Sequence, residues 1–213
     1  MCMTIEEIYN RRWQIRQYDE SSPPEKKLIV DLVNKTFDLT PSKQNLMPYR
    51  VHILGPEQTQ HKKDFWEISK TKPGGQHNYN IFAPYLFMFC MRKVTNPNKK
   101  VSAGIKNGSE YTCTTDNYEN GKIGACLEMG MFSTILTGLA LEQKLAVSYL
   151  LCFPDYKRDA KEYKGILSFL QGDYPLFVMG LGYPYNMKKN NPSHKWKAAG
   201  EDKPEQNEVV NWV

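Results

Sequence analysis

Apolar residues in this chain recur in two patterns, one with the period of a helix and one in short unbroken runs. A stripe with 3.6-residue spacing follows residue 25, and a longer segment that begins at Ile123 is apolar on nearly every face. The stripe indicates a helix packed on a core, and the all-round apolar segment indicates a helix at a core or an interface. Helices are predicted over residues 4–12, 23–37, 57–69, 123–145 and 157–170.

Short apolar runs bounded by glycine or proline predict the strands. The run Tyr85–Met91 follows Ala83-Pro84 and contains no charged residue, which is typical of a strand covered on both faces. Lys70–Asn80 and Asn96–Asn120 are polar and are expected to be loops, the second long enough to have a functional role. Strands are predicted at 49–54, 85–91, 147–153 and 176–182.

Two segments carry the signature of a helix start. Thr4 and Glu7 have the spacing of a capping box, in which each side chain accepts a hydrogen bond from the other residue's backbone. Ser22 and Glu25 repeat that spacing, with Pro23 at the expected first helical position. We therefore expect helices to begin at both places.

The order of these elements predicts a single domain over residues 1–213, with a sheet flanked by helices. Helices alternate with strands, and no internal repeat or low-complexity block divides the chain. The 213 residues are 40% apolar and 24% charged, ordinary values for a globular protein with a sizeable core. A short apolar cluster at residues 208–213 needs a burial site of its own.

Cysteine usage and hydropathy predict a cytoplasmic protein without a membrane span. The five cysteines form no CxxC pair, so reduced thiols are expected rather than a disulfide framework or a metal site. The uncharged stretch between Glu128 and Glu142 is shorter than the roughly 20 residues of a spanning helix. Residues 1–13 contain no apolar core of a secretory signal.

The formal net charge of +5 is mild and favours anionic ligands without requiring nucleic acid. A lysine-rich stretch from Lys188 to Lys203 has two interpretations, a solvated surface loop or a source of phosphate contacts. No basic stretch is interleaved with aromatic residues as in nucleic-acid-binding domains, so we expect no nucleic-acid partner.

The common catalytic motifs are missing from the sequence. It contains no GxSxG, HExxH or phosphate-binding glycine loop, and its four histidines are dispersed. We therefore assign no catalytic residue and expect no metal. A cofactor that brings its own chemistry accounts for this pattern.

Three segments in a fixed order carry a resemblance to a known family. Residues 11–19 read RRWQIRQYD, residues 41–51 read PSKQNLMPYRV, and residues 180–184 read GLGYP. In this order they resemble the nitroreductase family of FMN-dependent oxidoreductases, and the likeness covers roughly residues 5–213. Ala83-Pro84 before a strand, and the long helix that ends near Leu145, also fall where that family has them.

The resemblance implies an α+β fold with a nitroreductase-like mixed sheet flanked by helices. It further implies a homodimer with FMN at the interface, a long central interface helix, and a C-terminal extension over the partner subunit. That extension would bury the apolar cluster at residues 208–213.

The first motif would hold the flavin phosphate. Arg12 stands where the family has its first phosphate arginine and Arg16 at the later basic position, and a guanidinium binds phosphate through two hydrogen bonds. The alternative is a pair of surface arginines. Gln14 replaces the family's serine and follows Trp13, and both belong to the expected cofactor site.

The remaining cofactor contacts come from four further segments. Pro41, Ser42, Lys43 and Asn45 match the second motif, which reaches the flavin from the partner subunit; alternatively Ser42 and Asn45 cap a loop. Gln76 stands where the family binds the pyrimidine edge of the flavin, with Asn78 as the competing candidate. Pro154 follows a strand near the expected position of flavin N5, and Lys203, with Lys197 behind it, is expected at the phosphate.

The resemblance implies a function as an enzyme. NADH or NADPH would reduce the flavin, which would pass electrons to a small aromatic acceptor (a nitroaromatic, a quinone or a flavin) in ping-pong order. One alternative is a flavin-binding carrier or sensor dimer without efficient turnover. A basic nucleic-acid-binding domain is a further alternative, which predicts salt-sensitive binding and a colourless protein.

Overall fold

The computed structural model describes residues 4–10, 12, 15–42, 47–72, 75–91, 118–154, 163, 168–170, 173–185 and 209. The described residues form four α-helices, three short 3₁₀ turns and four strands. In chain order the elements are α1 (Ile5–Asn10), α2 (Lys26–Leu39), β1 (Tyr49–Leu54), α3 (Thr59–Ser69), the 3₁₀ turns η2 (Gly75–His77) and η3 (Tyr79–Phe82), β2 (Tyr85–Met91), α5 (Tyr118–Glu142), β3 (Ala146–Leu150), η5 (Ser168–Leu170) and β4 (Tyr174–Gly182).

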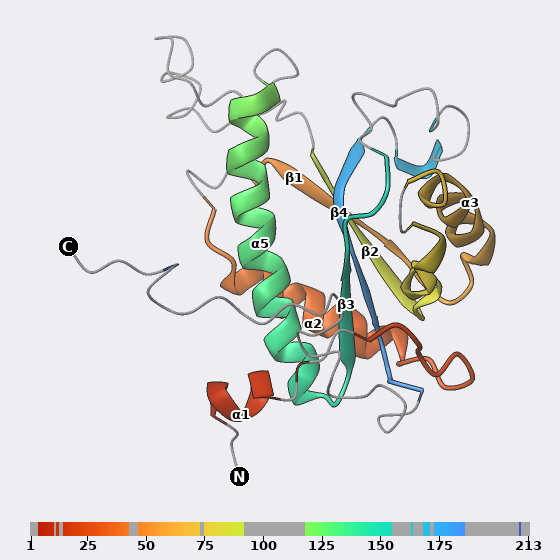
Figure 1. Ribbon diagram of the computed structural model, residues 1–213. Helices are drawn as coiled ribbons and strands as arrows, with labels where there is room; N and C mark the ends of the chain where they lie inside the picture. Colours follow the sequence, from red (N-terminus) through yellow and green to blue (C-terminus); the bar gives the residue numbers. More distant parts are fainter. Residues whose placement is uncertain are drawn as a thin grey trace, which may run out of the picture.

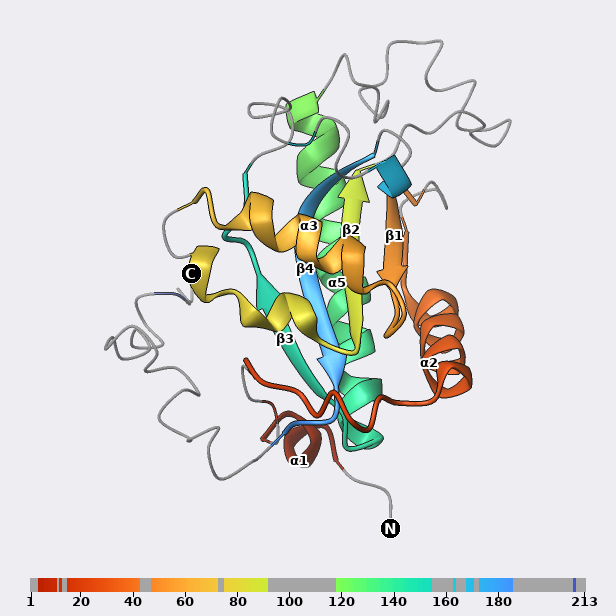
Figure 2. The same ribbon diagram turned by 90° about the vertical axis from the view of Figure 1, so that its right-hand side faces the viewer.

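The described chain forms three layers, with the sheet in the middle. Figures 1 and 2 show α5 and α2 on one face of the sheet, and α3 with η2 and η3 on the other. The predicted α+β class, with helices flanking a sheet and one long central helix, is confirmed.

The sheet has the strand order β1-β2-β4-β3, so β1 and β3 lie at its edges. All three pairings among the described strands are antiparallel, β1 with β2, β2 with β4, and β4 with β3. We expected a mixed sheet, whereas the described strands form antiparallel pairs only. Residues 186–213, where the expected C-terminal extension falls, lie outside the described part except for Val209.

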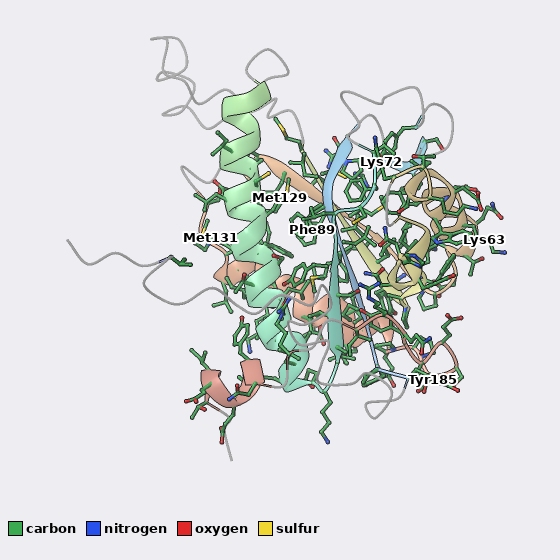
Figure 3. All side chains as sticks on the ribbon, viewed as in Figure 1. Lys63, Lys72, Phe89, Met129, Met131 and Tyr185 are labelled. Carbon is green, nitrogen blue, oxygen red and sulfur yellow. The ribbon has the colours of Figure 1, made fainter. Side chains whose placement is uncertain are left out.

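Strand β2 separates two hydrophobic cores. Its residues alternate between the two faces, as the two-residue period of a strand requires. Tyr85, Phe87 and Phe89 pack in the core beneath α5, whereas Leu86 and Met88 pack in the core beneath α3. In Figure 3, Met129 of α5 lies beside Phe89, and Met131 is on the outer side of the helix. All seven residues of β2 are buried, which confirms the predicted strand covered on both faces.

One of the two predicted helix starts is confirmed. At α1, the Thr4 backbone N–H donates to Glu7 Oε2 (2.7 Å) and the Glu7 N–H donates to Thr4 Oγ1 (3.2 Å), so the capping box forms. The second prediction is wrong by three residues, because α2 begins at Lys26 after an N-cap at Glu25 with no side-chain cap. The Pro24 carbonyl instead accepts a hydrogen bond from the Tyr85 hydroxyl, which holds the Pro23-Pro24 segment outside the helix.

The other element boundaries differ modestly from expectation. The predicted strands at Tyr49–Leu54 and Tyr85–Met91 have the observed bounds. The predicted loop Lys70–Asn80 contains η2 and the start of η3, because short 3₁₀ turns are stabilised by local contacts that apolar periodicity does not report. Most of the predicted loop at 96–120 and of the predicted helix at 157–170 lies outside the described residues.

Helix α5 is long and apolar enough to cross a membrane by length and composition alone. The stretch Ile123–Glu142 spans 20 residues with a mean hydropathy of 1.5, and 44% of its most apolar window is buried. The length of the uncharged run between Glu128 and Glu142 was therefore too narrow a criterion for a spanning helix, because such a helix tolerates one charged residue such as Glu128. A core helix of a globular protein has the same properties, and α5 packs on the sheet through Met129, Phe132 and Leu136.

A buried lysine joins α3 to the turn before β2. Lys62 is only 3% exposed, and its Nζ donates to the carbonyl oxygens of Ala83 (2.7 Å) and Pro84 (2.9 Å). Burial lowers the pKa of Lys62 to about 8, partly opposed by the negative charges of Glu20 and Glu57. The lysine thus orients the Ala83-Pro84 turn from which the central strand starts.

The buried Lys62 predicts a pH-dependent stability. Between pH 8 and 10 the unfolded chain keeps the proton on this lysine, whereas the folded protein loses it. At this lysine the unfolded state then binds more protons, so Lys62 contributes a rise in the free energy of unfolding with pH, opposite in sign to the contribution of the buried Cys90 thiol, whose pKa is raised. In Lys62→Met this rise is expected to disappear, whereas the exposed neighbour Lys63 provides a control, Lys63→Met, that retains it. Urea unfolding at half-unit pH steps measures the slopes, and parallel curves for wild type and Lys62→Met would contradict the assignment.

Candidate functional site

The first motif is anchored across the ends of β3 and β4 by backbone hydrogen bonds. The Ile15 N–H donates to Val147 O (3.4 Å), and the Asp19 N–H donates to Tyr183 O (2.9 Å). In return, the Tyr185 N–H donates to Gln17 O (3.3 Å). Residues 15–19 therefore follow the sheet as an added extended segment, and the motif has a fixed position relative to the strands.

Tyr18 ties this segment into the protein interior. Its buried hydroxyl lies 2.8 Å from Ser148 Oγ on β3 and donates to the Gly180 carbonyl on β4 (3.0 Å). Burial strongly raises the pKa of Tyr18, partly opposed by the hydrogen bond with Ser148, so the phenol stays neutral. Three segments that are remote in sequence, namely the one that contains Tyr18, strand β3 and strand β4, therefore meet at this hydroxyl.

The glycines of the third motif make room for this contact. A Cβ at Gly180 would lie 2.8 Å from Ser148 Oγ and 2.9 Å from Asn80 O, and one at Gly182 would lie 2.7 Å from Pro84 Cδ and 3.1 Å from Tyr18 Cδ1. Such distances are too short for a carbon atom. The GLGYP segment therefore has glycine at these positions because Tyr18 and the Ala83-Pro84 turn pack directly on β4.

Arg12 lies on the α5 side of the sheet, against an aromatic ring. Its Cζ is 5.2 Å from the centroid of the Tyr149 ring on β3, within the range of a cation–π interaction. Its backbone N–H donates to Tyr9 O at the end of α1 (3.0 Å). Burial and nearby Tyr149 raise the pKa of Tyr9, while the charge of Arg12 acts in the opposite direction. The guanidinium is half-buried between α1 and β3.

Arg16 lies on the other side of the sheet, at a pocket of about 440 Å³. The walls come from the segment around Tyr18, from η3 and from Tyr185, three residues after the end of β4; they comprise Arg16, Gln17, Tyr18, Asp19, Glu20, Ser21, Tyr79, Phe82 and Tyr185. Figure 3 shows Tyr185, one of these wall residues, at the lower end of the molecule. The aromatic walls suit a flat ring system, and the guanidinium of Arg16 shares the pocket with the carboxylates of Asp19 and Glu20.

The segments of Gln76 and Pro154 are brought together. Asn78, two residues after Gln76, donates through Nδ2 to Cys152 O (2.8 Å) and to Ser69 Oγ (2.9 Å). Cys152 is two residues before Pro154, which is itself buried and whose carbonyl accepts a hydrogen bond from Tyr163 (2.5 Å). Both Nδ2 protons of Asn78 are therefore used within the protein, which leaves its Oδ1 as the side-chain atom that could accept a hydrogen bond from a ligand.

The second motif stands apart from the first within one chain. Ser42 and Pro41 follow α2, and Ser42 Oγ accepts a hydrogen bond from the Met47 N–H (2.9 Å), so this serine closes the loop between α2 and β1. Figures 1 and 2 show α1 at the lower end of the molecule, while the chain leaves α2 toward the upper end, where β1 begins. The loop-capping interpretation of Ser42 therefore describes what it does within one chain.

Several predicted site residues fall outside the described part of the chain. These residues are Trp13, Gln14, Lys43, Asn45, Lys203 and the alternative Lys197. For Gln76 only the backbone, as part of η2, is described. Tyr149 and the aromatic wall of Tyr79 and Tyr185 were not predicted from the sequence. A tyrosine in a predicted strand is an ordinary strand residue, so no signal in the sequence distinguished Tyr149 from its neighbours.

Comparison with known proteins finds similarity in structure but not in sequence. No protein-family model matches the chain, and no curated protein matches it. Among solved structures, an NAD(P)H:FMN oxidoreductase, so named provisionally, from Staphylococcus epidermidis superposes with a TM-score of 0.71 at 12% identity, over 100% of this chain and 97% of the other. A provisionally assigned nitroreductase from Exiguobacterium sibiricum, solved in complex with FMN, gives 0.67 at 14% identity, over 100% and 99%.

A nitroreductase-like protein from Streptococcus mutans gives a TM-score of 0.67 at 14% identity, over 97% of this chain and 96% of that protein. Coverage of both chains is nearly complete in each case. This chain therefore has the nitroreductase fold, as the resemblance of its three motifs predicted.

Proposed function

We propose that this protein is an FMN-dependent oxidoreductase. In this proposal NADH or NADPH donates electrons, and a small aromatic acceptor (a nitroaromatic, a quinone or a flavin) receives them in a second half-reaction after the donor has left. The observation that carries the proposal is the junction at Tyr18, which joins the first motif to the glycines of the third. The FMN complex of a protein with the same fold supports the choice of cofactor.

The described residues offer FMN two guanidinium groups and a flat aromatic surface. FMN combines a phosphate dianion with a flat three-ring system, and the chain offers a half-buried guanidinium at Arg12 and an aromatic pocket with a guanidinium at Arg16. Arg12 would bind the phosphate through charge-assisted hydrogen bonds. Ile15, which stands between the two arginines in sequence, is hydrogen-bonded to the edge strand β3 at Val147, and the segment before Pro154 continues from that strand. We infer that FMN lies along this edge.

Bound FMN supplies the redox chemistry, and the protein positions the groups that react. The positive charge of Arg16 would stabilise negative charge on the pyrimidine side of the ring. Tyr79, Phe82 and Tyr185 would exclude water and provide flat surfaces for aromatic donors and acceptors. No residue of the chain is assigned as an acid, a base or a nucleophile.

We further propose that the active form is a homodimer. Helix α5 leaves large apolar side chains exposed, with Ile123 at 70% and Leu127 at 67%, and α2 does the same with Phe37 at 55% and Leu39 at 54%. Apolar surface of this kind on two elements of the same layer favours a protein interface. A second copy of the chain would cover it and bring its own Pro41, Ser42, Lys43 and Asn45 to the flavin. Lys203 is proposed at the phosphate, and the compartment is proposed to be the cytoplasm.

The first test is the visible absorption spectrum of the purified protein with added FMN. We expect flavin bands that shift on binding and that bleach under anaerobic conditions when NADH or NADPH is added. A bound flavin that neither nucleotide bleaches would favour a carrier or sensor. A protein that fails to bind added FMN would contradict the proposal altogether.

The phosphate and partner contacts are tested by Arg12→Ala and Ser42→Ala. Loss of hydrogen bonds to a charged phosphate is expected to weaken FMN binding by about ten- to a hundredfold for Arg12→Ala, and by less for Ser42→Ala. Quenching of flavin fluorescence measures the dissociation constant. Lys63→Ala, an exposed cation on α3, is the control and is expected to bind FMN as the wild type does. Unchanged binding in both site variants would show that the proposed positions are wrong.

The dimer is tested by a charge placed on the exposed face of α5. Leu127→Glu is expected to convert the dimer to a monomer, because the interface would then bury an unpaired carboxylate. Sedimentation velocity measures the change, and FMN affinity is expected to fall with it because half of each site is lost. Ile53→Glu on the edge strand β1 is the matched control and is expected to remain dimeric. A dimeric Leu127→Glu, or a monomeric wild type, would overturn this assignment.

A further inference from the structure

Helix α5 carries a small polar patch within its uncharged stretch between Glu128 and Glu142. Ser133, Thr134, Thr137 and Gly138 are spaced so that they lie on neighbouring turns of one side. A polar patch on a core helix needs hydrogen-bond partners. The Ser133 and Thr137 hydroxyls donate to carbonyls of the same helix, and two tyrosines from remote parts of the chain make further hydrogen bonds to the patch.

Tyr149 of β3 is held by the first of these contacts. Its hydroxyl lies 2.6 Å from Thr137 Oγ1 and donates to Ser133 O at 3.3 Å. The half-buried ring is thereby fixed at its far end, and its face is available to a neighbour above the strand. That neighbour is Arg12, whose Cζ is 5.2 Å from the ring centroid.

Tyr9 of α1 is held by the second contact and delimits the same space. Its hydroxyl donates to Thr134 O (2.8 Å), and the phenol packs against the helix at Gly138, where an added Cβ would lie in van der Waals contact with the hydroxyl at 3.4 Å. The Tyr9 carbonyl accepts the hydrogen bond from the Arg12 N–H (3.0 Å). Both the backbone and the guanidinium of Arg12 are thus located relative to α5.

We propose that Tyr149 is a positioning residue for the phosphate end of the flavin, acting through Arg12. The inference rests on the proposed function and adds to it a residue that the three motifs do not contain. An aromatic face orients a guanidinium and offers no anionic oxygen that would compete for its N–H donors. A carboxylate in the same position would instead pair with Arg12 and repel the incoming phosphate. Ordering the long arginine side chain before the ligand arrives lowers the entropic cost of binding.

The test compares FMN with riboflavin, which has the same ring system and no phosphate. Tyr149→Leu removes the aromatic face, and we expect its dissociation constant for FMN to rise about three- to tenfold while that for riboflavin stays at the wild-type value. Tyr149→Phe retains the ring and is expected to keep most of the preference for FMN. Fluorescence quenching measures both ligands. An equal loss for FMN and riboflavin, or no loss for either, would overturn the proposal.

A double-mutant cycle separates action through Arg12 from a general effect on the fold. In the Arg12→Ala background, Tyr149→Leu is expected to cause no further loss of FMN affinity, and an additive loss would count against the proposal. If Tyr149→Leu does not fold, Thr137→Val loosens the ring at its hydroxyl, and a smaller fall in the FMN-to-riboflavin preference is expected. A wild-type protein that binds neither ligand would instead refute the proposed function, and with it this inference.

Discussion

The arrangement of the site depends on the hydrogen bonds that the Tyr18 hydroxyl group makes. This hydroxyl joins an N-terminal segment to β3 through Ser148 and to β4 through Gly180. A buried phenol without such partners would be unfavourable, so the contact forms only when all three segments are in place. The two arginines that precede Tyr18 in the chain then have defined positions, Arg12 on the α5 side of the sheet and Arg16 at the pocket beside η3.

Helix α5 combines three roles that usually belong to separate elements. One side supplies Met129, Phe132 and Leu136 to the core, and a second side leaves Ile123 and Leu127 exposed. A third, formed by the polar patch, receives the tyrosines that flank Arg12. This division explains why the helix has no simple amphipathic pattern. In the proposed dimer, the same helix would link the subunit interface to the phosphate end of the cofactor site.

Local patterns predicted the parts of the fold that depend on local interactions. The strand bounds of β1 and β2 and the capping box of α1 followed from residues within one element. The start of α2 was predicted wrongly because a remote group, the Tyr85 hydroxyl, holds the Pro24 carbonyl. Likewise, the contacts of Asn78 could not follow from spacing, because its Nδ2 group donates to Ser69 and to Cys152, which is 74 residues away.

The sequence by itself determined the order of the elements, the two-sided burial of β2 and the identity of the three motifs, since apolar periodicity and glycine placement are properties of short segments. Only the tertiary structure decided that Tyr18 meets Ser148 and Gly180, 130 and 162 residues away, and that Arg12 rests on Tyr149. These contacts depend on how strands pair and layers stack. Such long-range packing involves the whole chain, and no window of neighbouring residues encodes it.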